Sequence, residues 1–526
     1  MTRKHLAAAS AVAVAALALS ACTATPNGGD GGDYVSGGTF VKALTGDPGS
    51  IIPFNAVSFD TWEVVSTAYE ALVYTTPDGE QKPWLAKSWE ESPNQVVFTL
   101  HDGITCADGT AFTAETAANN IAYNADPANA TFYYGATITE AVTATADGDT
   151  LTVKTSANDP FLLTNVGSIL MVCQAGIDDP DSLADSANGT SLFKLTDIKA
   201  QSSYTFEKRD GYTWGPDGVT SETKGLPDAI ELRIVDDVST RANLLLAGDI
   251  NAAPVVGADS ARLDSAGLKT VGVRNSVGEM LFNEHEGRVF SDPLVREALT
   301  TALNRGDVGA VLADGKALDA VSLVTKTPLL CVVDPPEWSL PDTDLEKAGE
   351  LLDQAGWKLG SDGLRTKDGE PLTVKFIYDA PTAAHAPAAE LVKETWDKLG
   401  VTTQLSANDA AAWSDQLFTT FDWDTGWVQL APNSPVQLST FFGATPVDGG
   451  LNFMFVDNPD YNANADKARA ASSSDEACGY WRDAETALIE RTDVFPLADN
   501  IIPTYMNGAV FEAPAYVMPT TIRMLG

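Results

Sequence analysis

Side chains that commonly carry out acid–base or metal chemistry are scarce in this sequence. The four histidines lie far apart, at His5, His101, His285 and His385, without an HxxxH or HxH spacing. Those spacings would bring two imidazoles to one metal ion, and little here could serve as a histidine general base. The tripeptide Glu284-His285-Glu286 is interpreted as a solvated turn. No GxSxG, Walker A or GxGxxG stretch stands out, so we predict no catalytic residue, metal site or cofactor.

The cysteine at position 22 has surroundings that point to covalent modification of its sulfur. A basic start is followed by an apolar run over residues 6–19 and by the small residues Ser20 and Ala21. This is the layout of a secretory signal, and the run is shorter than the roughly 20 residues of a membrane span. "LSAC" (19–22) resembles the bacterial lipobox, which implies a signal peptide over 1–21 and acylation of Cys22. The alternative is a soluble secreted protein with an accidental cysteine.

A flexible tether is predicted directly after the leader, over residues 22–38. Its sequence contains six glycines and almost nothing to bury, which is typical of a flexible coil. The predicted location is therefore the outer face of the cell membrane, where a lipid on Cys22 anchors the folded body.

Four further cysteines fit an oxidising compartment. They are Cys106, Cys173, Cys331 and Cys478, and no CxxC pair occurs, which disfavours a zinc ribbon or a thioredoxin-like site. Two disulfides would allow three connectivities. We favour Cys106–Cys173 and Cys331–Cys478, because each pair falls within one domain of the division given below. Four free buried thiols are the alternative.

The formal charge of the chain is strongly negative. It is −39 for the whole sequence and −41 once a leader with two basic residues and no acid is removed. A charge of this sign argues against nucleic acid and anionic lipid as partners. It favours solubility outside a cell and a mild attraction for cationic ligands.

Alternating strands and amphipathic helices together predict α/β domains. The expected strands cover 96–100, 151–155, 204–208, 230–235 and 372–378, and the expected helices cover 292–305, 342–357 and 387–401. Asp292 is a plausible N-cap followed by Pro293 at the first helical position. Gly356 and Gly400 are expected to end the second and third helices. With 526 residues the chain is too long for one core, and two or three domains are expected.

Five stretches, in the same order, resemble the bacterial extracellular solute-binding proteins of family 5. These are the oligopeptide-, dipeptide- and nickel-type binding lipoproteins of ABC importers. The stretches are 43–56, 68–115, 226–253, 280–305 and 343–357, and from the first to the last they span most of the mature chain. The second contains "YEALV", "LAKSWEE" and "DGT", which match the family pattern.

The resemblance implies a two-lobed fold like that of periplasmic binding proteins (type II, cluster C), with an extra subdomain in lobe one. Lobe one would comprise 37–70, 190–276 and 492–526, the extra subdomain 70–190, and lobe two 277–491. Such lobes close about a hinge over a ligand, and the closed form is recognised by the permease subunits of the transporter. A monomer is expected, and no bond would be made or broken.

Two loops of the family pattern line the cleft between the lobes. The first contributes Val57, Ser58, Phe59 and Asp60, and the second contributes Trp423, Trp427, Gln429, Leu430 and Asn433. In peptide binders the second loop reads Trp-x-x-Asp, and its Asp pairs with the α-ammonium of the ligand, a strong charge-assisted contact. Packing in the core is the alternative for Trp423 and Trp427.

This sequence departs from the family pattern at Leu430, which stands where the Asp is expected. Three explanations are open. The register could be shifted, another acid such as Asp60 or Asp424 could replace the missing one, or the ligand is not an α-amino peptide. Gln429 and Asn433 beside aromatic rings would suit a neutral polar ligand with an apolar face.

The leading hypothesis is therefore a lipid-anchored solute receptor of an ABC importer, with a peptide as the ligand. The alternative within the family is a binder of oligosaccharides or other non-peptides. A secreted hydrolase is a remote alternative, since 72 acidic residues allow carboxylate pairs. A purely structural surface lipoprotein would need no ligand cleft.

Overall fold

The computed structural model describes residues 33–526 except 57, 77–78, 136, 139–140, 328 and 431. The predicted acylation site Cys22, most of the predicted tether and the ligand-contact candidate Val57 lie outside the described residues. Within the described part, no helix combines the length and apolar character needed to cross a bilayer.

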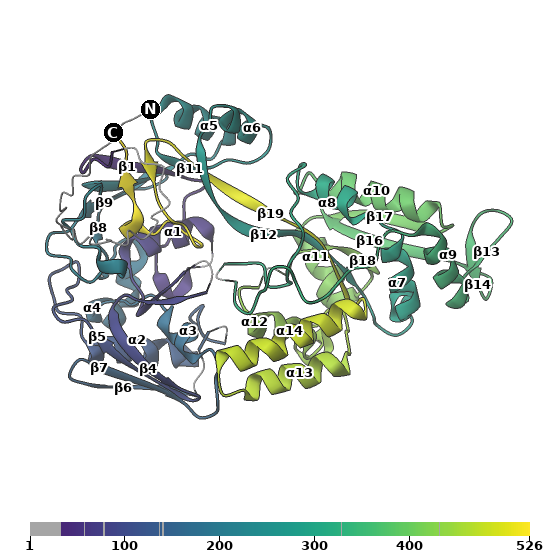
Figure 1. Cartoon of the computed structure of the whole chain (residues 1–526), viewed down its shortest axis with the longest axis horizontal. Helices are drawn as coiled ribbons and strands as arrows, with labels where there is room; N and C mark the ends of the chain where they lie inside the picture. Colours follow the sequence, from purple (N-terminus) through teal and green to yellow (C-terminus); the bar gives the residue numbers. More distant parts are fainter. Residues whose placement is uncertain are drawn as a thin grey trace, which may run out of the picture.

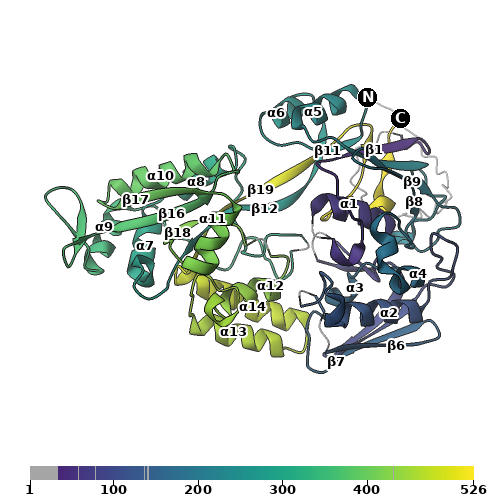
Figure 2. The same cartoon turned by 180° about the vertical axis from the view of Figure 1, so that it is seen from behind.

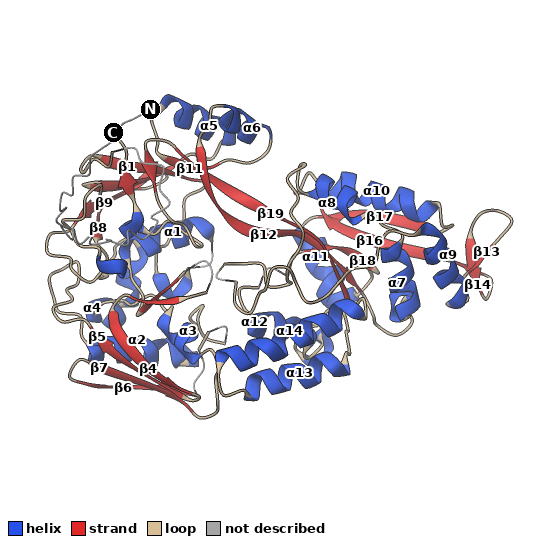
Figure 3. Ribbon diagram, in the orientation of Figure 1, coloured by secondary structure: helices blue, strands red, loops and turns tan. Residues whose placement is uncertain are grey.

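A ten-stranded sheet runs through the molecule (Figures 1 and 3). In spatial order its strands are β17 (Thr402–Asn408), β16 (Thr373–Asp379), β18 (Thr425–Val428), β12 (Lys269–Phe282), β19 (Val494–Met506), β11 (Ala252–Pro254), β1 (Thr39–Leu44), β10 (Ala229–Ile234), β9 (Ser203–Lys208) and β8 (Phe193–Lys199). Parallel pairs, β1 with β10 and β16 with β17, occur together with antiparallel pairs such as β12 with β19. This mixed sheet with flanking helices is the α/β class that the sequence predicted.

Strands β12 and β19 run from one body of the molecule into a second (Figures 1 and 2). We call the body that contains β1 lobe one and the body that contains β16 lobe two. The two strands pair antiparallel from Lys269 opposite Met506 to Leu281 opposite Val494, with register shifts on either side of Gly278. Tyr505 and Phe495, near opposite ends of β19, belong to different buried clusters.

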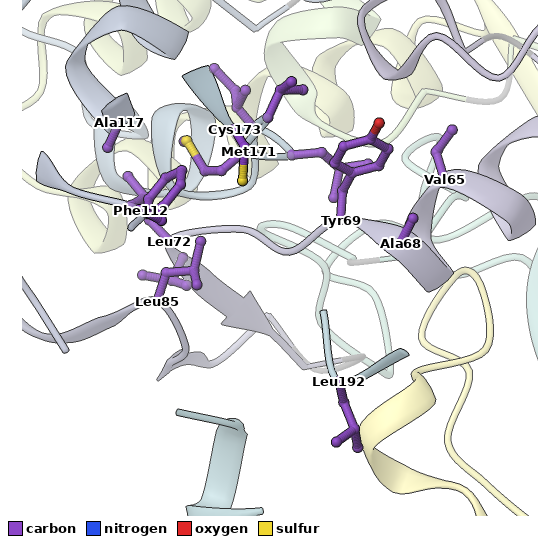
Figure 4. Packing of buried hydrophobic residues seen from close by; sticks show 14 of the residues in the cluster. Val65, Ala68, Tyr69, Leu72, Leu85, Phe112, Ala117, Met171, Cys173 and Leu192 are labelled. Atoms are coloured by element: carbon purple, nitrogen blue, oxygen red, sulfur yellow. The ribbon is translucent and has the colours of Figure 1, made fainter. Parts of the chain in front are cut away.

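Lobe one contains a second, four-stranded antiparallel sheet. Its strands are β4 (Ala86–Ser92), β5 (Gln95–Leu100), β7 (Thr150–Thr155) and β6 (Val142–Asp147), and α2 (Ala114–Ala125) packs on β6 and β7. Every second residue of β5 is buried, as expected for a sheet with one face on the core. Figure 4 shows part of that core, where Tyr69, Met171 and Cys173 lie close together. Cys173 is bonded to Cys106.

Helices cover the strands of lobe two on both faces of the sheet (Figure 3). They are α7 (Pro293–Thr301), α8 (Arg305–Leu312), α9 (Leu345–Gln354), α10 (His385–Asp397), α11 (Ala410–Asp415), α12 (Pro435–Ser439), α13 (Pro459–Ala470) and α14 (Ser474–Glu490). A disulfide joins Cys331, in the long connection between α8 and α9, to Cys478 of α14. The two disulfides thus have the connectivity favoured from the sequence.

The smaller elements complete the two lobes. The helices are α1 (Phe59–Ala68), α3 (Leu162–Gly167), α4 (Gln174–Asp178), α5 (Val238–Ala247) and α6 (Ala258–Ser265). The strands are β2 (Val73–Thr75), β3 (Gln81–Pro83), β13 (Lys358–Leu359), β14 (Arg365–Lys367), β15 (Glu370–Pro371), β20 (Ala509–Val510) and β21 (Arg523–Met524).

The expected strands and helices were correct in type. The strands were nearly correct in position, whereas each helix ends three or four residues earlier than predicted, including α10, which ends at Asp397. The five predicted strands correspond to β5, β7, β9, β10 and β16, each within one residue of the predicted ends. Asp292 caps α7 by accepting a hydrogen bond from the Leu294 N–H, but this helix ends at Thr301, earlier than expected. The second helix starts later than predicted, because Asp344 is its cap.

The predicted tether is too long at its C-terminal end. Tyr34 forms a β-bridge with Leu525, and the N–H groups of Val35 and Gly37 donate to the carbonyls of Met524 and Leu226 at 3.0 and 2.9 Å. Composition indicated a flexible coil, but the backbone of this segment is held by hydrogen bonds to distant parts of lobe one. Residues 34–38 therefore belong to the folded body.

Candidate functional site

The first predicted ligand loop leads into helix α1, which lies on the side of lobe one that faces lobe two (Figures 1 and 2). Ser58 is the N-cap of this helix, and its Oγ accepts a hydrogen bond from the Thr61 N–H at 3.1 Å. The Asp60 carboxylate is buried and accepts from the N–H and the Oγ1 of Thr45 at 3.0 and 2.7 Å. Phe59, in contrast, is 43% exposed. Ser58 is exposed as well, but its Oγ is engaged at the N-terminus of the helix, so Phe59 offers the larger free surface to a ligand.

Phe59 belongs to a cluster of aromatic rings that come from three distant segments. Tyr516 lies 5.4 Å from Phe59 between ring centroids and stacks on Trp62 at 5.5 Å with an interplanar angle of 11°. Phe132 contacts the edge of Trp62 at 6.3 Å and is 44% exposed. Large exposed apolar groups that gather at one place commonly mark a binding surface. We call Phe59, Trp62, Phe132 and Tyr516 the aromatic cluster.

A buried ion pair lies directly behind the aromatic cluster. Lys42 of β1 donates to Glu63 Oε1, and both side chains are 1% exposed. The Lys42 Nζ is 5.6 Å from the centroid of the Phe59 ring. Glu63 Oε2 has no hydrogen-bond donor within the described residues. Burial raises the pKa of Tyr516, and the negative charge of Glu63 raises it further.

The two tryptophans of the second predicted loop lie in the core of lobe two. Trp423 is 0% and Trp427 1% exposed. The Trp427 Nε1–H donates to the His385 carbonyl at 3.1 Å, and the ring packs against Phe376. Burial therefore supports core packing, which was the alternative kept open from the sequence. Neither ring offers a surface to a ligand in this structure.

The residues that follow β18 return to the surface. Gln429 is exposed and donates from Nε2 to the Ser276 carbonyl of β12 at 2.6 Å. Asn433 is exposed, and its backbone N–H donates to Gln437 Oε1 at 2.9 Å. Leu430, which stands in place of the family's Asp, is 7% exposed. The described contacts do not bring this loop against the aromatic cluster of lobe one.

A carboxylate that sequence reasoning missed lies beside Leu430. Glu279 of β12 is 2% exposed, and its Oε2 accepts a hydrogen bond from the Leu430 N–H at 3.3 Å. Glu279 Oε1 has no donor among the described residues. Burial raises the pKa of Glu279 to about 7, because no cation offsets the loss of hydration. A single acid inside the apolar run "VGEMLF" (277–282) was the signal that could have identified it.

The two acids named from the sequence as substitutes for the missing Asp are engaged elsewhere. Asp60 binds Thr45, as described above. Asp424 is 5% exposed, accepts from the Lys375 N–H at 2.7 Å and pairs with Arg288 at 3.4 Å. Burial raises the pKa of Asp424 despite these partners. Glu279 is thus the carboxylate that contacts the position of the missing Asp.

Glu279 should make the stability of the ligand-free protein depend on pH. Its folded-state pKa of about 7 lies above the ordinary value of 4.5. The folded protein therefore retains a proton that the unfolded chain releases, and this contribution to stability is lost as pH rises from 4.5 to 7. Glu279→Gln removes the titration. We expect the free energy of unfolding of the variant, relative to wild type, to increase by up to about 3 kcal/mol between pH 4 and 8.

Denaturant unfolding of both proteins across this pH range measures the effect, since other titrating groups cancel in the difference. A difference that stays constant with pH would contradict a buried, unpaired carboxylate at position 279.

The pockets that stand out in the described residues lie within lobe two and not at the predicted ligand loops. One is a small cavity of about 20 Å³ beneath the Cys331–Cys478 bridge, near Trp338, Trp481 and Glu485. The other is an open pocket of about 450 Å³ near Asn458 and Arg491. No group of three or more His, Cys, Asp or Glu with the geometry of a metal site occurs in the described chain.

Comparisons with known proteins give a consistent result. The family model described as "Bacterial extracellular solute-binding proteins, family 5 Middle" matches residues 80–449. The oligopeptide-binding protein OppA of Bacillus subtilis is 24% identical over 520 residues, which cover 91% of each chain. The fold matches that of the ABC transporter substrate-binding protein CtaP of Listeria monocytogenes with a TM-score of 0.78 and 18% identity, over 93% of this chain and 99% of that one.

A second solved structure is a substrate-binding protein of Microbacterium hydrocarbonoxydans in complex with 4-hydroxybenzoate hydrazide. It matches with a TM-score of 0.68 and 23% identity, over 92% of this chain and 99% of that one. The predicted two-lobed α/β fold class is confirmed by these structures.

Proposed function

Because the chain belongs to the bacterial extracellular solute-binding proteins of family 5, we propose that it is a lipid-anchored receptor that captures a peptide between its two lobes and delivers it to the permease of an ABC importer. The protein is a solute-binding component of such an importer. The peptide, the lipid anchor and the delivery step are the parts that we propose. No chemical change of the solute is part of this function.

The observation that carries the proposal is the connection between the lobes. Two buried cores are joined by β12 and β19, and Ile501 and Ile502 of β19 are 41% and 40% exposed between those cores. A pair of long strands with little packed around its middle can bend or twist while each core stays intact. We propose that the lobes, with the boundaries predicted from the sequence, close over the solute about this segment.

Contacts at the edge of the lobes opposite the strands support closure. Phe161, just before α3 of lobe one, is 4% exposed and belongs to a buried cluster that otherwise consists of residues from 281 to 494. Nearby, the Asn158 Nδ2 donates to the Ala470 carbonyl at the end of α13 at 3.4 Å. Burial of a phenylalanine ring contributes about 1.5–3 kcal/mol. Phe161 is therefore positioned to favour the closed form.

Phe161→Ala is expected to shift the lobes toward an open arrangement. The lost burial corresponds to a change of roughly tenfold or more in the closure equilibrium. Small-angle X-ray scattering of the ligand-free protein should give a larger radius of gyration for the variant. Phe418→Ala, which truncates a ring of lobe two that is 38% exposed, is the matched control. Equal scattering profiles for Phe161→Ala and wild type would contradict this role.

A peptide is supported by the named activity of OppA. We propose Glu279 as the partner of the peptide ammonium, which requires the segment at Leu430 to move, because Glu279 is 2% exposed in this structure. The carboxylate contacts the backbone at Leu430 and has one oxygen without a donor in the described chain. An ammonium brought to this oxygen would gain a charge-assisted hydrogen bond. The second candidate is a non-peptide solute, which the absence of an acid at position 430 favours.

Native mass spectrometry of the purified protein tests these two candidates. A co-purified peptide mass that is lost in Glu279→Gln would support peptide capture. A series of sugar masses, or an aromatic solute such as the one bound by the Microbacterium protein, would replace the peptide with the second candidate. Turnover of any captured solute by the pure protein would contradict a pure binding function.

The lipid anchor has its own test at Cys22. Without the sulfur no acyl chain can be attached, and the tether alone has no affinity for a bilayer. We expect Cys22→Ala to move the protein from the membrane fraction to the medium, with an unchanged circular dichroism spectrum. Ser20→Ala is a matched control, because it changes a neighbouring residue and keeps the sulfur. Retention of Cys22→Ala in the membrane fraction would contradict the anchor.

A further inference from the structure

We propose that the aromatic cluster of lobe one is a binding subsite for an aromatic ring of an uncharged or cationic solute. This inference rests on the proposed capture of a solute between the lobes and specifies the chemistry of that solute. It comes from the way four rings are arranged around helix α1.

The four rings pack against one another, and the surface that they form is partly exposed to solvent. Trp62 and Tyr516 are stacked at 5.5 Å, which holds both rings in fixed orientations. Phe59 and Phe132 flank them and leave 43% and 44% of their surfaces exposed. A further aromatic ring can pack against this surface face to face or edge to face, a contact that contributes beyond the burial of apolar area.

The charged pair behind the rings offers nothing to an anion. Lys42, the cation beside Phe59, is held by Glu63 Oε1, and both side chains are 1% exposed. The Lys42 charge is therefore paired and covered. The faces of Trp62 and Tyr516, in contrast, attract cations. A neutral or cationic solute is thus favoured over an anion.

The elements that carry the cluster place it opposite lobe two. Helix α1 supplies Phe59 and Trp62 one turn apart, and it lies on the side of lobe one that faces lobe two in Figures 1 and 2. Tyr516 comes from the C-terminal segment after β20, and Phe132 from the segment before β6. A ring held here would be met by lobe two when the lobes close.

Three small probes distinguish the contribution of an aromatic ring to binding from the contribution of a charge. Tyramine has an aromatic ring and an ammonium, 2-cyclohexylethylamine keeps the ammonium without the π system, and 3-(4-hydroxyphenyl)propionate keeps the ring with a carboxylate. Binding to the full-length protein is measured by isothermal titration calorimetry and saturation-transfer NMR. We expect tyramine to bind at least about fivefold more tightly than either of the other two probes.

Substitutions in the aromatic cluster test whether tyramine binds there. Trp62→Leu and Phe132→Leu should each raise the Kd of tyramine at least about fivefold, because each removes a ring that the probe contacts. Phe132 is 44% exposed, so its replacement is expected to leave the melting temperature almost unchanged. Phe418→Leu, in lobe two and 38% exposed, is the control and should leave the Kd unchanged.

Absence of tyramine binding, equal affinity for tyramine and 2-cyclohexylethylamine, or an unchanged Kd in both variants would overturn the subsite. Tighter binding of the carboxylate probe would overturn its charge preference. One outcome separates this subsite from the proposed function. If Trp62→Leu still bound a co-purified solute normally, the subsite would be contradicted, but the capture of a solute would not.

Discussion

Replacing Arg296 with alanine is expected to destabilise lobe two by about 3–5 kcal/mol or to prevent its folding. The guanidinium of this α7 residue is 2% exposed. Its Nε–H donates to the Thr492 carbonyl at 2.9 Å, its Nη1 to the Phe290 carbonyl at 2.7 Å, and its Nη2 to Asp493 Oδ1 at 3.0 Å. One side chain thus fixes helix α7 to the start of β19.

The size of the effect follows from the charges that would remain. Asp493 is 0% exposed, and Glu284 lies 3.3 Å from Arg296 with a side chain that is 10% exposed. Burial raises the pKa of Glu284, and the neighbouring Asp493 raises it further. Without Arg296, the cation that the described residues leave to these carboxylates is Arg491, which is 34% exposed. An uncompensated buried charge is strongly destabilising.

Denaturant unfolding followed by tryptophan fluorescence measures this loss. Arg262→Ala is the matched control, because Arg262 is 48% exposed and pairs with Asp259 within one helix. Exposed pairs of that kind contribute at most about 1 kcal/mol. A similar, small loss for Arg296→Ala and Arg262→Ala would contradict a structural role for the buried cluster.

The second large effect is expected in lobe one at Glu70. This carboxylate is 1% exposed and accepts hydrogen bonds from Tyr212 Oη at 2.7 Å, Thr190 Oγ1 at 2.9 Å and Trp214 Nε1 at 2.9 Å. Burial raises its pKa to about 7, although the three donors act in the opposite direction. Glu70 joins the segment after α1 to the segments before β8 and after β9.

Glu70→Ala would leave three buried donors without an acceptor. Each unpaired buried donor costs about 1–3 kcal/mol, so we expect a loss of at least about 3 kcal/mol in the free energy of unfolding of lobe one. Glu70→Gln keeps one acceptor oxygen and should lose less. Glu90→Ala, at an exposed position of β4, should stay within about 0.5 kcal/mol of wild type. A stable Glu70→Ala variant would contradict this account.

Glu70 belongs to a motif that indicates the family but does not indicate the partners of this carboxylate. "YEALV" was part of the resemblance, but no residue nearby in the sequence explains an acid within an apolar segment. The donors that explain it lie 120 to 144 residues further along the chain. The turn interpretation of Glu284-His285-Glu286 was limited in the same way. It holds for the exposed His285 and Glu286 but is wrong for Glu284, which binds Arg296.

The ligand-contact candidates that were chosen from the sequence include both exposed and buried side chains. Ser58, Phe59, Gln429 and Asn433 are exposed, whereas Asp60, Trp423, Trp427 and Leu430 are buried. Local sequence does not distinguish a tryptophan in a core from one in a binding site, because both environments are apolar. The aromatic cluster combines residues 59, 62, 132 and 516, and no local pattern relates these positions.

The sequence by itself determined the class of the molecule and those local elements that have a clear periodicity or cap. Alternation of apolar residues defined the strands, and capping residues such as Asp292 defined helix starts, because both signals act between residues close in the chain. Tertiary structure alone decided which charges are buried in pairs, that Glu279 lies against Leu430, and which aromatic rings meet beside α1. These features depend on contacts between residues hundreds of positions apart, and a side chain's surroundings are fixed only when those segments pack together.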